Sequence, residues 1–368
     1  QRLRPGAGSF ANAVLRRIAE LVATAERRPM TDTGRLREPG LDEIPLADGT
    51  AMRLGVELFD GDEVRVLAHQ TSHAPFLVRR WIEQFGRAHA LAILLHDIVV
   101  PPITIIGLPA DSPIDKVLVE GTIPHESGRG HVLDLRGAQG VRTSIRAFLD
   151  AHPSARVQDI VSAMPVEATR SLQPRLVIDL CAGRGTKTRQ LAGTHPGARI
   201  VASDVDEERY RALREVFRGH ARVEVKSPAE VSRMRGAADL VLADVPCSNT
   251  GVLARRLEAR YRIDATRLDE LSRIQRRILS KAAELTRAGG YILYSTCSIE
   301  PEENVQQSAW AVATLGVRLE SDHASLPAGI PGGPPSRYTD GGYYALLRRP
   351  PKSTKPSRAS RSSRPPIG

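Results

Sequence analysis

From Leu176 onward, short apolar runs alternate with stretches of helical spacing. The apolar runs predict four strands, at Leu176–Leu180, Arg199–Ser203, Leu240–Ala243 and Tyr291–Ser295. The longest predicted helix, Arg267–Leu285, carries its apolar side chains on one face. Apolar strands that alternate with helices are typical of a parallel sheet covered on both faces. The sequence therefore predicts a doubly wound α/β domain, in which ligands bind at the carboxyl ends of the strands.

The chain before this domain is less regular. Residues 9–26 have the apolar spacing of an amphipathic helix, and Phe76–Phe85 is a second predicted helix, which Pro75 begins and Gly86 ends. Residues 28–60 are polar and turn-rich, so we expect a long connection or short helices there. In the mixed region that follows we predict two strands, Ile103–Ile106 and His131–Leu135.

Composition restricts the partners of the chain. No apolar run approaches the roughly 18 residues that span a bilayer, so no membrane is expected. The net charge of +10 favours a polyanion. Five of these charges lie in residues 350–368, a segment without acids that we expect to be a disordered basic tail, which leaves +5 for residues 1–349. Because the chain begins with Gln1, we also expect that residues precede it.

The chain has three cysteines, Cys181, Cys247 and Cys297, without C-x-x-C spacing. An odd and sparse set argues against a disulfide framework and against a zinc site. The sequence therefore predicts a cytoplasmic protein without a metal.

A small-residue turn follows the first predicted strand, and an acid closes the second. The turn comprises Cys181, Ala182, Gly183, Arg184, Gly185, Thr186 and Lys187. Asp204 lies 19 residues after Gly185, where a carboxylate can accept hydrogen bonds from ribose hydroxyls. These features favour a nucleoside cofactor, although dinucleotide enzymes and purely structural turns share them. Arg184, Lys187 and Arg189 crowd a helix N-terminus, where they either face solvent or meet an anion.

Two cysteines fall at the same edge of the predicted sheet. Asp244 and Cys247 follow one strand, and Cys297 follows another. Cysteines are often merely small buried residues, which is the simpler interpretation and the one we prefer for Cys181. Carbon 5 of cytosine, however, becomes nucleophilic only when a thiolate adds to carbon 6, and a carboxyl group and a second acid/base must assist. Cys297, Asp244 and Cys247 supply that set.

The motifs resemble those of the Nol/Nop/Sun family of RNA cytosine-5 methyltransferases. The resemblance covers most of residues 9–349, and the joint presence of the Pro-Cys and Thr-Cys motifs is its most specific part. The matching segments are Ser72–Trp81, Val157–Asp159, Asp179–Thr188, Ala202–Arg209, Asp244–Gly251, Ser295–Asn304 and Asp340–Leu346.

The resemblance implies an activity and a role for each site residue. The expected activity is methylation of a cytosine in structured RNA, with small-subunit 16S ribosomal RNA as the expected substrate and S-adenosylmethionine as the cofactor. Cys297 is expected to attack carbon 6, Cys247 to help proton removal and product release, and Asp244 to contact the base near the cofactor. The turn Cys181–Lys187 is expected to hold the methionine end, and Asp204 the ribose.

The resemblance also implies a domain organisation. Residues 1–65 are expected to be the remnant of a helical NusB-like domain with its linker, and residues 66–155 a small α/β RNA-binding subdomain. Residues 156–349 are expected to form a Rossmann-like methyltransferase domain with a mostly parallel sheet, followed by the tail of residues 350–368. We expect a monomer.

Three departures from the family pattern favour an alternative function. The family usually has Ala-Pro-Gly-Gly-Lys where this chain has Gly183–Lys187, so that Arg184 replaces a proline and Thr186 a glycine that tolerates positive φ. The acid that holds the adenosine is missing at Lys226–Ala229, where Glu230 is the nearest substitute. The alternative is an RNA-binding member with weakened catalysis that acts in ribosome assembly. The three retained groups, Cys297, Cys247 and Asp244, favour the active enzyme.

Overall fold

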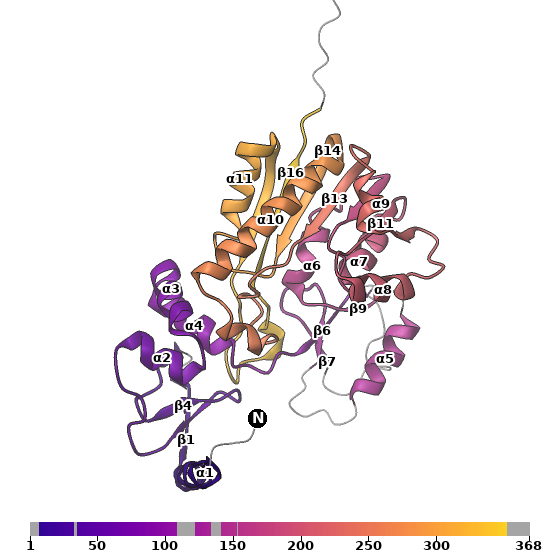
Figure 1. The fold of residues 1–368 in the computed structure, drawn as a ribbon. Helices are drawn as coiled ribbons and strands as arrows, with labels where there is room; N and C mark the ends of the chain where they lie inside the picture. The colour runs from indigo at the N-terminus through magenta and orange to yellow at the C-terminus, as the bar shows by residue number, and fades with distance from the viewer. Residues whose placement is uncertain (1–6, 33–34, 109–121, 134–140, 153, 352–368) are drawn as a thin grey trace, which may run out of the picture.

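The computed structural model describes residues 7–32, 35–108, 122–133, 141–152 and 154–351. Its C-terminal part is a seven-stranded sheet with helices on both faces (Figure 1), in the strand order β12-β11-β10-β13-β14-β16-β15. Strand β16 runs antiparallel to both of its neighbours, and the other six strands are parallel to one another. This is the mostly parallel, Rossmann-like sheet that the sequence predicts.

The strands of this sheet are β10 (Leu176–Asp179), β11 (Arg199–Ala202), β12 (Val223–Val225), β13 (Ala238–Asp244), β14 (Thr286–Thr296), β15 (Arg318–Ser325) and β16 (Gly342–Arg348). The helices between them are α7 (Thr186–Thr194), α8 (Glu207–Val216), α9 (Pro228–Ser232), α10 (Ala265–Leu285) and α11 (Val305–Leu315), with two short 3-10 turns, η2 (Leu257–Tyr261) and η3 (Pro335–Arg337). The four predicted strands and the predicted long helix are confirmed.

Apolar side chains on both faces of the sheet explain its stability. On one face α10 and α11 pack against the sheet around Tyr294 and Leu279, and on the other α7 and α8 pack around Leu191 and Leu213. These side chains are fully buried, and burial stabilises each by roughly 1.5–3 kcal/mol. Aspartate side chains cap the starts of α8 and α10: the carboxylate of Asp264, for example, accepts a hydrogen bond from the Arg267 amide at 2.8 Å.

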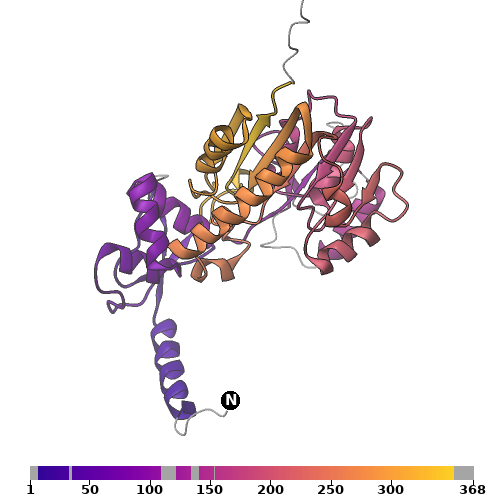
Figure 2. The same cartoon turned by 45° about the horizontal axis from the view of Figure 1, so that its top comes forward.

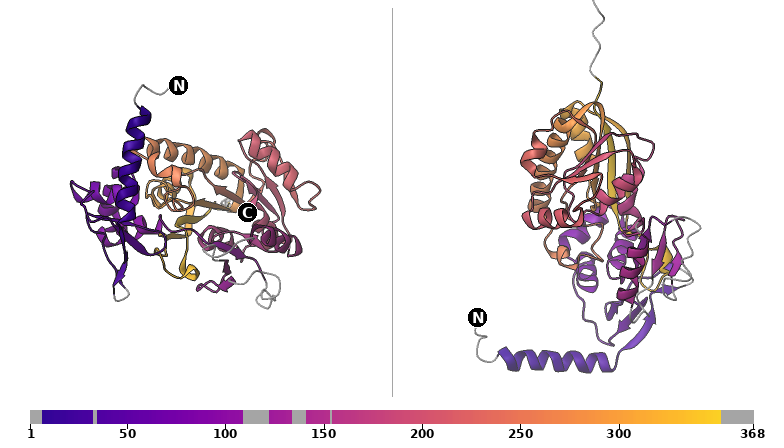
Figure 3. Two further views of the ribbon diagram at one scale, coloured as in Figure 1. Left: turned by 90° about the horizontal axis from the view of Figure 1, so that it is seen from below. Right: turned by 90° about the vertical axis from the view of Figure 1, so that its right-hand side faces the viewer.

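The first 60 residues differ from the prediction in part. The expected helix is present as α1 (Ala7–Ala23), which extends away from the rest of the molecule (Figure 2 and the right-hand view of Figure 3) and exposes Phe10 and Leu15. The described residues between 26 and 53 form short antiparallel strands instead of a plain connection or helices. They are β1 (Glu26–Pro29), β2 (Thr31–Asp32), β3 (Arg35–Leu36), β4 (Glu43–Pro45) and β5 (Thr50–Arg53).

Three helices then pack against the main domain. They are α2 (Glu63–Thr71), α3 (Pro75–Phe85) and α4 (Arg87–His96), and α3 confirms the predicted helix. Their buried side chains share one apolar cluster with Leu253 and Ile299, which lie in loops at the carboxyl edge of the large sheet. The N-terminal helices therefore support the loops of that edge directly.

A second, smaller sheet lies between these helices and the main domain in sequence. Its strand order is β7-β8-β6-β9, and β6 confirms the predicted strand. Of the predicted strand His131–Leu135, residues 131–133 form β8, and the rest lies outside the described residues. The elements are β6 (Ile103–Ile106), β7 (Thr122–Pro124), β8 (His131–Leu133), α5 (Val141–Ala151), β9 (Arg156–Val157) and α6 (Ile160–Glu167).

The expected basic tail lies outside the described residues from residue 352 onward. In the part of the chain that the structure describes, no helix has the length and apolar character needed to cross a bilayer.

Candidate active site

The two cysteines at the sheet edge lie against each other. Cys247 follows β13 and Cys297 follows β14, and their Sγ atoms are 3.0 Å apart. The two loops are joined through Gly251, whose amide donates to the carbonyl of Cys297 at 3.0 Å and whose carbonyl accepts from the Gly341 amide at 2.6 Å. A Cβ at position 251 would lie 2.5 Å from the Gly341 carbonyl oxygen, so only glycine allows this approach.

Of the two thiols, Cys297 is the one that lines a cavity. This cavity is also lined by Lys187, Asp244 and Tyr344, but not by Cys247. The Cys297 thiol donates to Oδ1 of Asn249 at 3.3 Å, while Nδ2 of Asn249 donates to the carbonyl of Cys247 at 3.0 Å. Asn249 has a φ of 64°, a left-handed conformation that asparagine tolerates better than most residues. Asn249 therefore fixes the position of Cys297 relative to the second loop.

A partly buried ion pair faces the same cavity. Nζ of Lys187, at the start of α7, lies 2.9 Å from Oδ2 of Asp244 at the end of β13. The other oxygen of Asp244 accepts from the Ser295 hydroxyl at 2.6 Å. Burial acts to lower the pKa of Lys187, but the charge and hydrogen bond of Asp244, together with Cys297, outweigh it and raise that pKa above its usual range. Lys187 is therefore a fixed cation beside the cavity thiol.

Cys247 differs from Cys297 in its surroundings. Its hydrogen bond with Cys297, then burial, and then the nearby Glu303 raise the pKa of the Cys247 thiol well above its usual value. Glu303 itself is fully buried beneath the two loops. Its carboxylate accepts from the amide of Ser248 at 2.9 Å and from Nε2 of Gln275 at 2.9 Å. Cys247 is therefore a neutral thiol held in place by a buried polar network.

A contact from α3 supports the loop that carries Cys297. The carboxylate of Glu300, fully buried three residues after Cys297, accepts from Nε1 of Trp81 at 3.0 Å and forms an ion pair with Arg80. Arg80 also pairs with Glu302. The helices before the large sheet thus support the loop that carries the cavity thiol.

The turn after β10 can accommodate a nucleoside cofactor. Gly183 and Gly185 both have positive φ, and a Cβ on Gly185 would lie 2.5 Å from the ring of Phe217. A Cβ on Gly183, in contrast, would have only one neighbour, the Cys181 carbonyl oxygen at 4.0 Å, so the turn is open there. The carboxylate of Asp204 accepts from the Gly183 amide at 2.9 Å and keeps further lone pairs for hydroxyl donors.

Three further observations at these strand ends fit such a cofactor. Val205, directly after Asp204, is 86% exposed, which suits an apolar ring stacked on it. The buried Oδ1 of Asp179 and Oγ of Ser203 have no hydrogen-bond partner among the described residues. Buried polar atoms are rarely left unpaired, so atoms of a polar ligand fit there.

The three departures from the family pattern differ in how they affect the structure. Thr186 is the first residue of α7, and the non-glycine residues with positive φ in the described part are Ser72 and Asn249, so the Thr186 backbone carries no strain. Arg184 is exposed. Glu230, by contrast, forms a capping box with Ser227 at the start of α9, which occupies the carboxylate that was the nearest substitute for the missing adenosine acid.

The predicted site residues therefore gather at one edge of the sheet. Lys187, Asp244 and Cys297 share a cavity, Cys247 contacts Cys297, and Asp204 contacts the turn at Gly183. The sequence did not identify Asn249, Glu303 or the Trp81–Glu300 contact, because polar residues in loops carry no periodic signal of burial. Among the described residues no group of three or more His, Cys, Asp or Glu could hold a metal ion.

Comparison with known proteins gives the family. Residues 165–347 match the model of a family described as 16S rRNA methyltransferase RsmB/F. Ribosomal RNA small subunit methyltransferase B of Cronobacter sakazakii is 31% identical over 236 residues, which cover 60% of this chain and 54% of that protein. The chain spans about half the length of the curated relatives it matches.

Solved structures share the fold. A methyltransferase homolog protein from Pyrococcus horikoshii has a TM-score of 0.62 at 22% identity, covering 79% of this chain and 100% of that one. NSun6 from Pyrococcus horikoshii with SFG has a TM-score of 0.58 at 16% identity, covering 74% and 97%. The fold is that of S-adenosylmethionine-dependent methyltransferases, and S-adenosylmethionine is the cofactor that the sequence predicts. Through residues 165–347, the chain belongs to the RsmB/F family of RNA methyltransferases.

Proposed function

We propose that the protein methylates carbon 5 of a cytosine in 16S ribosomal RNA, with S-adenosylmethionine as the methyl donor. The observation that carries the proposal is the cavity in which a thiol, a carboxylate and an ammonium group, those of Cys297, Asp244 and Lys187, lie together. Relatives named for ribosomal RNA methylation support the choice of substrate. Such a substrate is cytoplasmic, and we propose that the protein acts there as a monomer.

The residues of this chain divide the proposed reaction among them. Cys297, beside the Lys187 ammonium, attacks carbon 6 as a thiolate, and a C–S bond forms while carbon 5 becomes nucleophilic. Asp244 binds the polar edge of the base and holds Lys187 in place. The cofactor supplies the methyl group that carbon 5 takes up. The turn Cys181–Lys187 and the Asp204 carboxylate hold the cofactor. The target base must leave its stack to enter the cavity.

Cys247 is suited to the later elimination step. In the resting site, its hydrogen bond with Cys297 is the largest cause of its raised pKa. Once Cys297 carries the base as a thioether, that cause is removed, so the Cys247 pKa falls at the stage when a base is needed. Cys247 releases its own proton to solvent at that stage, and the resulting thiolate takes the proton from carbon 5; the C–S bond breaks, and Cys297 leaves as a thiolate.

The alternative function is an RNA-binding protein with weakened catalysis that acts in ribosome assembly. One observation favours it: Oε2 of Glu230 is already used by the capping box of α9, which holds this carboxylate at the helix start. Titration calorimetry with S-adenosylmethionine separates the two functions. We expect saturable binding by the unchanged chain and its loss in Asp204→Ala, whereas no heat of binding by the unchanged chain would favour the alternative.

Incubation with 16S ribosomal RNA and methyl-labelled S-adenosylmethionine tests the activity itself. We expect label in 5-methylcytidine after nuclease digestion, and none with Cys297→Ser, because a serine hydroxyl is far less ionised than a thiol. Arg277→Ala, an exposed change on α10, is the matched control and should keep the activity. Label in another nucleoside would refute the proposed position of methylation.

A further inference from the structure

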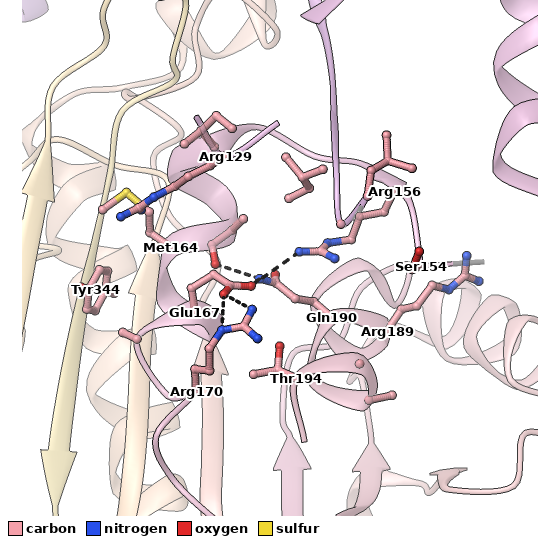
Figure 4. A pocket seen from close by; sticks show the side chains of 18 of the residues that line it. Arg129, Ser154, Arg156, Met164, Glu167, Arg170, Arg189, Gln190, Thr194 and Tyr344 are labelled. Atoms are coloured by element: carbon pink, nitrogen blue, oxygen red, sulfur yellow. Dashed lines mark hydrogen bonds and ion pairs between the residues drawn. The ribbon is translucent and has the colours of Figure 1, made fainter. Parts of the chain in front are cut away.

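A large pocket lies beside the active site, between the small sheet and helices α6 and α7. Its volume is about 740 Å³, which lies within the range of about 300–1,000 Å³ typical of ligand sites. The side chains labelled in Figure 4 come from several segments, among them Arg129 from the loop before β8, Arg156 from β9, and residues of the two helices. None of the proposed catalytic or cofactor-binding residues lines it.

The walls of this pocket carry a large excess of positive charge. Besides the phenol of Tyr344, its ionisable lining is five arginines, one histidine and a single carboxylic acid: Arg129, Arg156, Arg170, Arg189, Arg222, His220 and Glu167. We call this the arginine pocket. A single carboxylate cannot neutralise five guanidinium groups, so the pocket attracts anions.

The one acid is already engaged. Glu167 accepts from Nε of Arg170 at 3.0 Å and from Nε2 of Gln190 at 3.2 Å, as Figure 4 shows. Arg156 reaches it only at 4.0 Å. The Arg222 guanidinium donates to backbone carbonyls, with the Ala192 oxygen at 2.9 Å.

Arg156 gives the strongest indication that the pocket binds an anion. Its side chain is only 15% exposed, and its Nε donates to the neutral Oε1 of Gln158 at 2.6 Å. Burial lowers the pKa of Arg156 below its usual value, with Glu167 giving only partial compensation. A buried cation with so little compensation is stabilised when an anion enters the pocket.

The arginine pocket adjoins the cavity of Cys297. Met164 of α6 and Tyr344 of β16 line both of them. A polyanionic strand whose base enters the cavity can therefore continue past Tyr344 into the arginine pocket. Aromatic rings next to a basic groove are typical of single-strand binding, because bases stack on them.

We propose that the arginine pocket binds phosphate groups of the RNA strand next to the target cytidine. The proposal rests on the proposed function, because it takes the nucleotide in the Cys297 cavity to be part of an RNA. It goes beyond that function by assigning Arg129, Arg156 and Arg189 to the flanking phosphates. Contacts to phosphates should strengthen RNA binding by an amount that depends on the salt concentration and not on the base sequence.

A double variant tests the proposal without breaking an ion pair. Arg129 and Arg189 are exposed, and neither forms an ion pair with a described residue. Arg129→Ala/Arg189→Ala is compared with Arg277→Ala/Arg318→Ala, which removes the same charge from exposed positions on α10 and β15. Fluorescence anisotropy of a labelled, unstructured ten-nucleotide RNA with one cytosine is measured between 50 and 300 mM salt. Thermal melting checks that both variants fold.

We expect the pocket variant to lose about 1.4 from the magnitude of the slope of log K against log salt, the amount for two single-strand phosphate contacts. The control variant should keep the slope of the unchanged chain. Equal slopes for both variants would overturn the proposal. A pocket variant that loses affinity for free CMP but keeps its affinity for the RNA would also overturn it, because the pocket would then be a mononucleotide site.

The same assay separates this proposal from the proposed function, because it involves no methyl transfer. A pocket-dependent slope in a chain that methylates no RNA would refute the function alone. Methylation of ribosomal RNA with equal slopes would refute the arginine pocket alone.

Discussion

Asp179, at the end of β10, is fully buried, and Thr188 donates its hydroxyl to Oδ2 at 2.7 Å. Burial, opposed by that hydrogen bond, raises the pKa of Asp179 to about 7. Between pH 4 and 7 the unfolded chain has therefore lost this proton while the folded protein still holds it. Because the folded state binds more protons in this range, the free energy of unfolding falls as pH rises. A pKa rise of this size corresponds to about 4 kcal/mol at most.

Asp179→Asn removes the titration and should flatten this fall. Urea unfolding without cofactor, at pH 4.5 and pH 8, measures it: we expect Asp179→Asn to gain stability relative to the unchanged chain only at the higher pH. Thr188→Val should steepen the fall, because the hydroxyl stabilises the charged carboxylate. An equal effect of Asp179→Asn at both pH values would contradict the account of this residue.

At the scale of elements, the contact between α3 and the Cys297 loop links the N-terminal helices to the site. Trp81→Phe keeps the ring but removes the donor to buried Glu300, at a cost of about 1–3 kcal/mol. We expect a lower urea midpoint and a lower methylation rate. Trp310→Phe on α11, whose ring contacts the Arg276 guanidinium, should cost less than about 1 kcal/mol and leave the rate unchanged. Equal rates in both variants would show that the contact does not position Cys297.

The sequence predicted those elements whose pattern is strong. Buried parallel strands such as β10 and β13 are continuous apolar runs, and the turns after them carry the site residues, so fold and site edge follow from the pattern. Strand β1, Glu-Arg-Arg-Pro, is exposed throughout and has no such pattern, so the sheet of the first 60 residues was missed.

Pairings across elements could not be predicted in the same way. The Lys187–Asp244 ion pair depends on how α7 lies over β13, and the arginine pocket gathers residues from positions 129 to 222. The division of residues 1–155 into two units stays a prediction, as do the roles assigned to the site residues.

At the scale of the whole molecule, we expect the basic segment of residues 350–368 to contribute to RNA binding. Residues 350–368 carry five cations and no acid. If all five contact single-stranded phosphates, removing these residues should reduce the salt slope of RNA affinity by up to about 3.5. Binding of S-adenosylmethionine, measured by calorimetry, should not change. A salt slope equal to that of the full chain would show that these residues do not contact RNA.

The central claim is that Cys297 forms a covalent bond to the RNA and Cys247 helps to break it. Cys247→Ala should permit attack and methyl transfer but stall elimination, so that RNA stays bonded to Cys297. Denaturing electrophoresis of Cys247→Ala, Cys297→Ala and the double variant, each with labelled 16S ribosomal RNA and S-adenosylmethionine, measures this directly. We expect a protein–RNA band that survives denaturation with Cys247→Ala alone. A band with Cys297→Ala instead would reverse the two roles, and no band with either single variant would contradict the covalent mechanism.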